Sequence, residues 1–116
     1  MSVPRSARRF TLEEANALLP TVRQITDRAV REAASLAEHM ASVMPGSDEH
    51  RRLEEELHAI VTGWAAEVEA LGAEAKGLWL VDFDTGDGCY CWKHPEPSVT
   101  HYHGYTDGFA GRMKIV

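Results

Sequence analysis

The sequence has few cysteines and no long apolar run, and each shortage excludes a class of protein. The two cysteines, Cys89 and Cys91, are one residue apart on a predicted strand, so a disulfide between them would be badly strained. This excludes a small secreted scaffold held together by disulfides. No apolar run approaches the roughly 20 residues that span a bilayer, and the first residues lack the apolar core of a signal peptide. We therefore expect a cytoplasmic protein with no membrane partner.

Positive charge is also scarce. Twelve Lys and Arg residues against 18 Asp and Glu residues give a formal net charge of −6. A protein that neutralises phosphates needs a basic face, so we expect no nucleic-acid partner. A chain of 116 residues that is 44% apolar can bury a core without metals or disulfides. We expect residues 1–116 to form a single domain.

Glycine is almost absent from the first two thirds of the chain, where apolar residues follow a helical period. Residues 1–9 lack this period and are rich in arginine, which predicts a flexible basic arm. Thr11 and Glu14 have the spacing of a capping box, so a helix should begin there. Pro20 has no N–H to donate within this helix, which predicts that the helix bends or restarts near this residue.

A Pro-Gly pair at 45–46 ends the first helical pattern, and Ser47 is a suitable N-cap for a second helix. Gly72 follows that helix, where a C′ glycine is common. The short link predicts an antiparallel helical hairpin over residues 10–72. Each arm would be on the order of 35 Å long, more than a small sheet can cover. We therefore expect some of the apolar residues that form a stripe along these helices to contact a second copy of the chain in a homodimer.

In the last third of the chain the apolar period changes to two, and glycine and aromatic residues become frequent. This predicts a small antiparallel sheet of three to four strands over residues 77–116. The expected strands are 78–83, 89–93, 99–103 and 113–116, with turns at 84–88 and 94–97 and a Gly-rich loop at 104–112. The fold class is α+β, with the helical hairpin packed on the sheet.

Alternation along a strand predicts that Cys89 and Cys91 share one face, as do His101 and His103. If Asp82 lies on the same face, a thiolate, an imidazole and a carboxylate come together, as zinc and iron sites require. Two thiols separated by one residue on a regular strand are too far apart to bind one ion, so we expect only one to bind. Zinc or iron, with copper less favoured, would be held by residues drawn from His103, Cys91, His101, Glu96, Asp82 and His94.

The same residues permit other functions, and the sequence does not decide whether the protein is an enzyme. A bound metal with an open position could act as a Lewis acid on a small-molecule ligand. Alternatively, the chain is a non-enzymatic dimeric adaptor whose helical stripe binds a partner and whose polar cluster is structural. A second alternative is a metal-free acid–base enzyme that uses His103 and Glu96, with Arg112 binding an anionic ligand or pairing with Glu96. Nucleophilic catalysis by Cys91 lacks a local cysteine-hydrolase signature.

Five blocks of sequence carry a resemblance to a known family. They are residues 10–20, 80–83, 91–92 with 96–97, His103, and 108–112. In this order they resemble the bacterial domain-of-unknown-function family 2203 over nearly the whole chain. The family has no established activity, so the resemblance implies an architecture and a set of positions of interest. These positions are Glu14, Asn16, Pro20, Asp82, Cys91, Trp92, Glu96, His103, Gly108 and Arg112.

The chain also departs from this family's usual pattern. Pro95 stands where the family usually has glycine, Tyr102 where it has tryptophan, and Gly104 where it has an acid. The missing acid argues against any role that needs a carboxylate directly after His103. The residues that look like additions peculiar to this chain are Cys89, His94 and His101.

Overall fold

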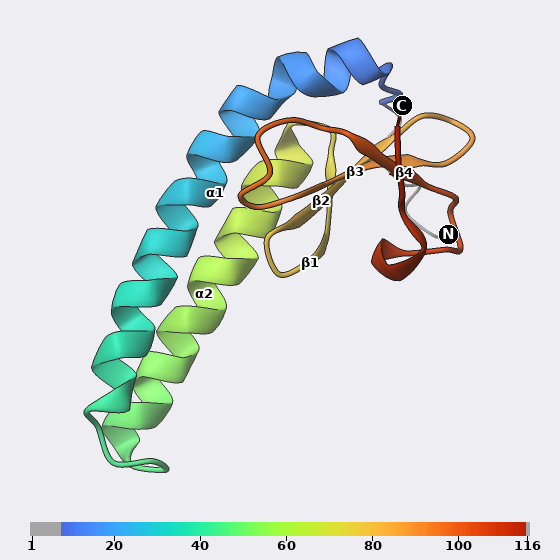
Figure 1. Ribbon diagram of the computed structural model, residues 1–116. Coiled ribbons are helices and arrows are strands. Elements are labelled where there is room, and N and C mark those ends of the chain that lie inside the picture. The colour runs from blue at the N-terminus through green and yellow to red at the C-terminus, as the bar shows by residue number, and fades with distance from the viewer. Residues whose placement is uncertain (1–7, 116) are drawn as a thin grey trace, which may run out of the picture.

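The computed structural model describes residues 8–115, in which two long helices precede a sheet (Figure 1). The helices are α1 (Leu12–Ala41) and α2 (Asp48–Ala70). The strands are β1 (Glu74–Gly77), β2 (Leu80–Asp84), β3 (Cys89–Lys93), β4 (His101–His103) and β5 (Met113–Lys114), with a short 3₁₀ helix, η1 (Phe109–Gly111), before the last. The expected α+β class is confirmed.

α1 begins at the predicted capping box. The backbone N–H of Glu14 donates to Thr11 Oγ1 at 3.1 Å, and the Thr11 N–H donates to Glu14 Oε1 at 2.9 Å. The helix continues through Pro20 without a restart. Figure 1 shows its first turns inclined to the remainder, in agreement with the predicted bend.

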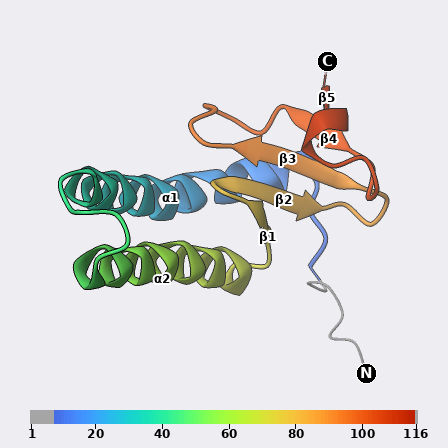
Figure 2. The same cartoon turned by 90° about the horizontal axis from the view of Figure 1, so that it is seen from below.

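α2 runs antiparallel to α1 and has the predicted ends. Ser47 Oγ accepts from the His50 N–H at 3.1 Å, and Gly72 adopts a φ of +93° directly after the helix. The two helices are tied by a buried hydrogen bond from Trp64 Nε1 to Thr26 Oγ1 at 2.8 Å. The hairpin extends well past the edge of the sheet (Figure 2). Among the described residues, neither helix combines the length and apolar character needed to cross a membrane.

The sheet has five strands in the order β1-β2-β3-β4-β5, each antiparallel to its neighbours, so the expectation of three to four was too low. The missed strand is β1, whose sequence Glu-Ala-Lys-Gly contains residues that are uncommon in strands. Trp79, with a φ of +59°, lies in the turn between β1 and β2, which delays the start of β2 to Leu80. Tertiary pairing, rather than local propensity, makes this segment a strand.

The sheet has one apolar and one polar face. Val81, Phe83 and Trp92 are fully buried and belong to the same core cluster as Leu19 and Val22 of α1. This apolar face is the one that packs on the helical hairpin. The residues that alternate with these apolar ones, such as Asp82 in β2 and Cys91 in β3, project to the opposite face, where the candidate site lies.

Part of the expected basic arm, residues 1–7, lies outside the described residues. Arg8 Nη1 donates to the Leu71 carbonyl at 2.9 Å, and Arg9 lies 3.3 Å from the carboxylate of Asp84. The N–H of Phe10, whose side chain is buried, donates to the Asp84 carbonyl at 2.7 Å. The segment before α1 is thus attached to both halves of the fold.

Candidate metal centre

Strand register brings the polar side chains together on one face of the sheet. Asp82 pairs directly with Cys91 across β2 and β3, so the two side chains share a face, as a common site requires. Across β3 and β4, Cys89 pairs with His103 and Cys91 pairs with His101. All five side chains therefore project to the side opposite the helical hairpin.

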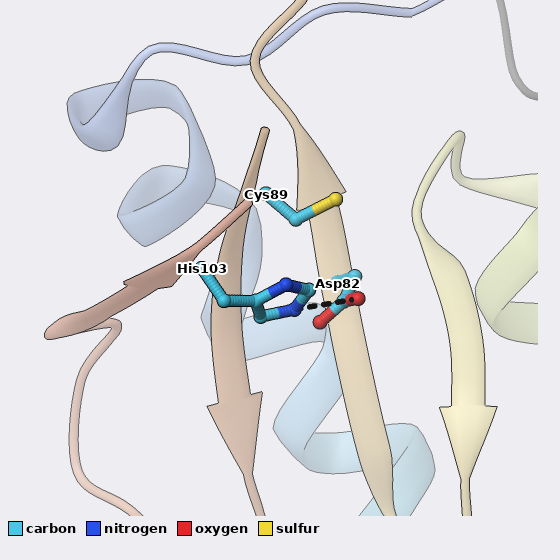
Figure 3. A group of neighbouring side chains, drawn as sticks. All are labelled: Asp82, Cys89 and His103. Carbon is cyan, nitrogen blue, oxygen red and sulfur yellow. Dashed lines mark hydrogen bonds and ion pairs between the residues drawn. The ribbon is translucent and has the colours of Figure 1, made fainter. Parts of the chain in front are cut away.

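Three of these polar residues form a group that is able to hold a metal ion. One ligand atom each from Asp82, Cys89 and His103 lies within 4.8 Å of the others. The three residues come from three adjacent strands, and their side chains converge (Figure 3). Their exposed fractions are only 2%, 1% and 4%, respectively, so the group is shielded from solvent. Carboxylate, thiolate and imidazole are all ligands of zinc and iron in proteins.

The imidazole of His103 is held with one nitrogen directed at the group. Its Nδ1 lies 2.7 Å from the carbonyl oxygen of Gly104, which can only accept, so Nδ1 carries the hydrogen in this contact. Its Nε2 lies 2.9 Å from Asp82 Oδ2 (dashed in Figure 3). This separation is that of a hydrogen bond, so a proton lies between these two atoms, and a metal ion bound by both would take the place of that proton.

The second carboxylate oxygen of Asp82 is unusual. Oδ1 is buried and has no hydrogen-bond partner among the residues that the structure describes. Buried charged oxygens are normally paired, because leaving one unpaired lowers stability. The thiol of Cys91 lies against this carboxylate but is only a weak donor, so a cation at this position would satisfy Oδ1 better.

A small pocket opens next to the group. Its volume is about 270 Å³, and two of the three candidate ligands, Asp82 and His103, contribute to its wall. The remaining lining residues are Lys76, Leu80, Tyr105, Gly108 and Phe109. The pocket therefore borders the group on the side of Asp82 and His103.

Cys91 was the predicted thiol ligand, but Cys89 takes that place in the group. Cys91 is fully buried beside Asp82 and Arg112. Burial, reinforced by the negative charge of Asp82, raises the pKa of its thiol to about 12. A thiol with so high a pKa is neutral near pH 7, which makes Cys91 a poor nucleophile as well.

Glu96, Arg112 and His101 form a separate cluster next to Cys91. The guanidinium of Arg112 donates two hydrogen bonds to Glu96, at 3.0 and 2.7 Å. Of the two roles predicted for Arg112, the structure shows the pairing with Glu96. Burial alone would raise the pKa of Glu96, but hydrogen bonds from Arg112 and from the Lys93 N–H hold it below its usual value. His101 Nδ1 lies 3.8 Å from Glu96. Neither Glu96 nor His101 belongs to the metal-capable group.

His94, the remaining predicted ligand, is also outside the group. Its Nε2 lies 2.7 Å from Asp27 Oδ1 on α1. This contact ties the turn after β3 to the helical hairpin. His94 therefore has a structural partner of its own, away from Asp82 and His103.

Of the six predicted ligands, the metal-capable group contains two, Asp82 and His103, and adds Cys89. Alternation had placed Cys89 on the same face as Cys91, but it could not show which thiol lies nearer Asp82. The pairing of Cys89 with His103 depends on the register between β3 and β4, which the loop 94–100 sets.

Comparison with known proteins supports the resemblance noted in the sequence. The family described as "Uncharacterized conserved protein (DUF2203)" matches residues 8–115, nearly the whole chain. No curated protein and no solved structure matches.

Proposed function

We propose that this chain, which belongs to the DUF2203 family of uncharacterised conserved proteins, binds a transition metal through Asp82, Cys89 and His103. A thiolate and an imidazole favour zinc or iron over magnesium and calcium, which prefer ligand sets made only of oxygen. Three protein ligands leave a position for water or a small molecule, as in catalytic zinc sites. Such an ion could act as a Lewis acid. A cysteine must stay reduced to bind it, which agrees with the expected cytoplasmic location.

The observation that carries the proposal is the arrangement of acceptors around Asp82. Oδ1 is buried without a partner among the described residues, while Oδ2 faces His103 Nε2, whose other nitrogen is committed to Gly104. A metal ion would satisfy the carboxylate and take the imidazole lone pair at once. The Gly104 carbonyl would then be the outer partner that orients a metal-binding histidine.

The test compares two buried cysteines on one strand. Wild-type protein without a His-tag, Cys89→Ala and Cys91→Ala are loaded with zinc or iron(II) and dialysed, and their metal content is measured by elemental analysis. About one ion per chain is expected for the wild type and for Cys91→Ala, with a large loss for Cys89→Ala, because only Cys89 is in the group. Circular dichroism verifies that both variants fold. Equal metal content in the two variants, or no retained metal in the wild type, contradicts the proposal.

We also propose the homodimer expected from the sequence, whether or not a metal binds. In α1 the fully buried residues end at Ala29, and beyond it Leu36 and Met40 remain only half-buried. The hairpin extends past the sheet in this region (Figure 1). A second copy that packs on this stripe would remove its apolar surface from water.

A further inference from the structure

We propose that the ion at Asp82, Cys89 and His103 keeps one coordination position open to the adjacent pocket, and that this position takes a small carboxylic acid. The inference rests on the proposed metal site and names its ligand class. Binding is a ligand exchange in which a carboxylate oxygen replaces a water molecule on the metal. No electron is transferred.

The position of the pocket gives the direction of approach. Asp82 and His103 contribute to its wall, whereas Cys89, the third candidate ligand, does not. The pocket therefore lies on the Asp82 and His103 side of the group, and Cys89 lies behind. A fourth ligand would reach the ion through the pocket, as substrates reach three-ligand zinc sites.

The size and walls of the pocket limit the molecule that it can take. A volume of about 270 Å³ is at or below the lower end of the roughly 300–1,000 Å³ usual for ligand sites, so the ligand must be small. Leu80 and Phe109 provide apolar wall. The guanidinium of Arg112 lies 4.4 Å from the centre of the Phe109 ring, a cation–π contact that helps to hold this ring in place. A short hydrocarbon chain fits these surroundings better than a fully hydrated inorganic ion.

Charge favours an acid as the polar end of that molecule. A divalent ion with an Asp82 carboxylate and a Cys89 thiolate forms a centre of zero net charge, which does not repel an anion. Among the residues that line the pocket, Lys76 alone carries a permanent positive charge. Its Nζ forms an ion pair with Glu74 Oε1 at 3.5 Å, and because an ammonium has three N–H donors, it keeps donors for a ligand carboxylate.

The test uses protein loaded with cobalt(II), whose visible absorption reports on its ligands and which accepts the same donor atoms as zinc. Acetate and butyrate are titrated separately into the wild type, and the change in cobalt absorption gives each dissociation constant. Both acids are expected to bind in competition with water. Butyrate should bind more tightly, by about fourfold for each CH₂ group that becomes buried against Leu80 and Phe109.

Two matched lysine variants test the charge. Lys76→Gln should weaken the binding of both acids by up to about fivefold, since the side chain is partly exposed. Lys114→Gln, on the exposed strand β5, should bind them as the wild type does. Cobalt content should be the same in all three proteins, because neither lysine is a candidate ligand.

The outcomes separate the two proposals. If cobalt binds at one per chain through Cys89 and neither acid changes its spectrum, the open position is refuted and the metal site stands. If both acids bind equally well and Lys76→Gln has no effect, the pocket does not select the ligand and the inference fails. If cobalt is not retained, the metal site and the inference fail together.

Discussion

Replacing Asp82 by asparagine should affect stability in opposite directions with and without metal. The amide has nearly the shape of the carboxylate, so the change removes charge without creating a cavity. In metal-free protein the carboxylate is buried with Oδ1 unpaired among the described residues. A buried unpaired polar group lowers stability by about 1–3 kcal/mol, and a charged one by more.

The contact with His103 can be kept in the variant. With its hydrogen on Nδ1, neutral His103 accepts at Nε2 from the new amide, so neither side chain is left as an uncompensated charge. We expect metal-free Asp82→Asn to be between 0 and about 2 kcal/mol more stable than the wild type.

Metal should reverse this order. Zinc at 100 times its dissociation constant adds about 2.7 kcal/mol to the free energy of unfolding of the wild type. For a domain of this size, that corresponds to an increase in Tm of about 10 °C. Asp82→Asn loses a charged ligand, so its Tm should hardly respond to zinc.

The assay is thermal unfolding by circular dichroism, once in EDTA and once in buffered zinc. Asp84→Asn is the control, because Asp84 is buried on the same strand but its carboxylate binds Tyr105, Arg9 and the Gly86 N–H. This control should be less stable in both conditions and should keep the zinc-dependent increase. The reasoning is refuted if Asp82→Asn is destabilised by about 3–5 kcal/mol in EDTA, as for a purely structural buried ion pair, and zinc leaves the wild type unchanged.

Three further predictions concern the rest of the fold. Thr26→Val should lower the free energy of unfolding in urea by about 1–3 kcal/mol, because it leaves the Trp64 N–H buried without an acceptor, and Thr26→Ser should restore most of it. Glu96→Gln should be less stable than the wild type by about 1 kcal/mol near pH 7. Arg112 contributes to holding the pKa of Glu96 below its ordinary 4.5. The difference in stability between the wild type and Glu96→Gln should therefore be present above pH 4.5 and vanish as the pH falls through the lower folded-state pKa. An unchanged difference in acid unfolding at pH 2 would contradict the stabilising role of the Glu96–Arg112 pair. Leu36→Glu, on the half-buried stripe of α1, should convert the proposed homodimer to a monomer in light scattering, while a monomeric wild type would refute the dimer.

Much of the helical half follows from local chemistry. Thr11, Ser47 and Gly72 mark helix ends because side-chain caps and a positive φ depend on only a few neighbouring residues. Strand β3 also has its predicted bounds, since turn residues and prolines flank it. The bend at Pro20 follows from the missing N–H in the same local way.

Long-range pairing decided what the local pattern could not. The segment 74–77 has little preference for a strand and forms β1 only because β2 supplies the hydrogen bonds. The shared face of Cys89 and Cys91 follows from alternation alone, and so does that of His101 and His103.

Which thiol joins the candidate site was a matter of tertiary structure. Asp82 lies directly opposite Cys91 in the sheet, yet its carboxylate groups with the diagonal neighbour Cys89, which lies opposite His103. Arg112, which follows η1, lies against Cys91 instead. The amino-acid sequence thus determined that Cys89 shares a face with Cys91 and that His101 shares one with His103, because alternation is a property of any strand. The choice of partners across that face required the register of β4 and the path of the last segment, which depend on contacts between residues far apart in the chain.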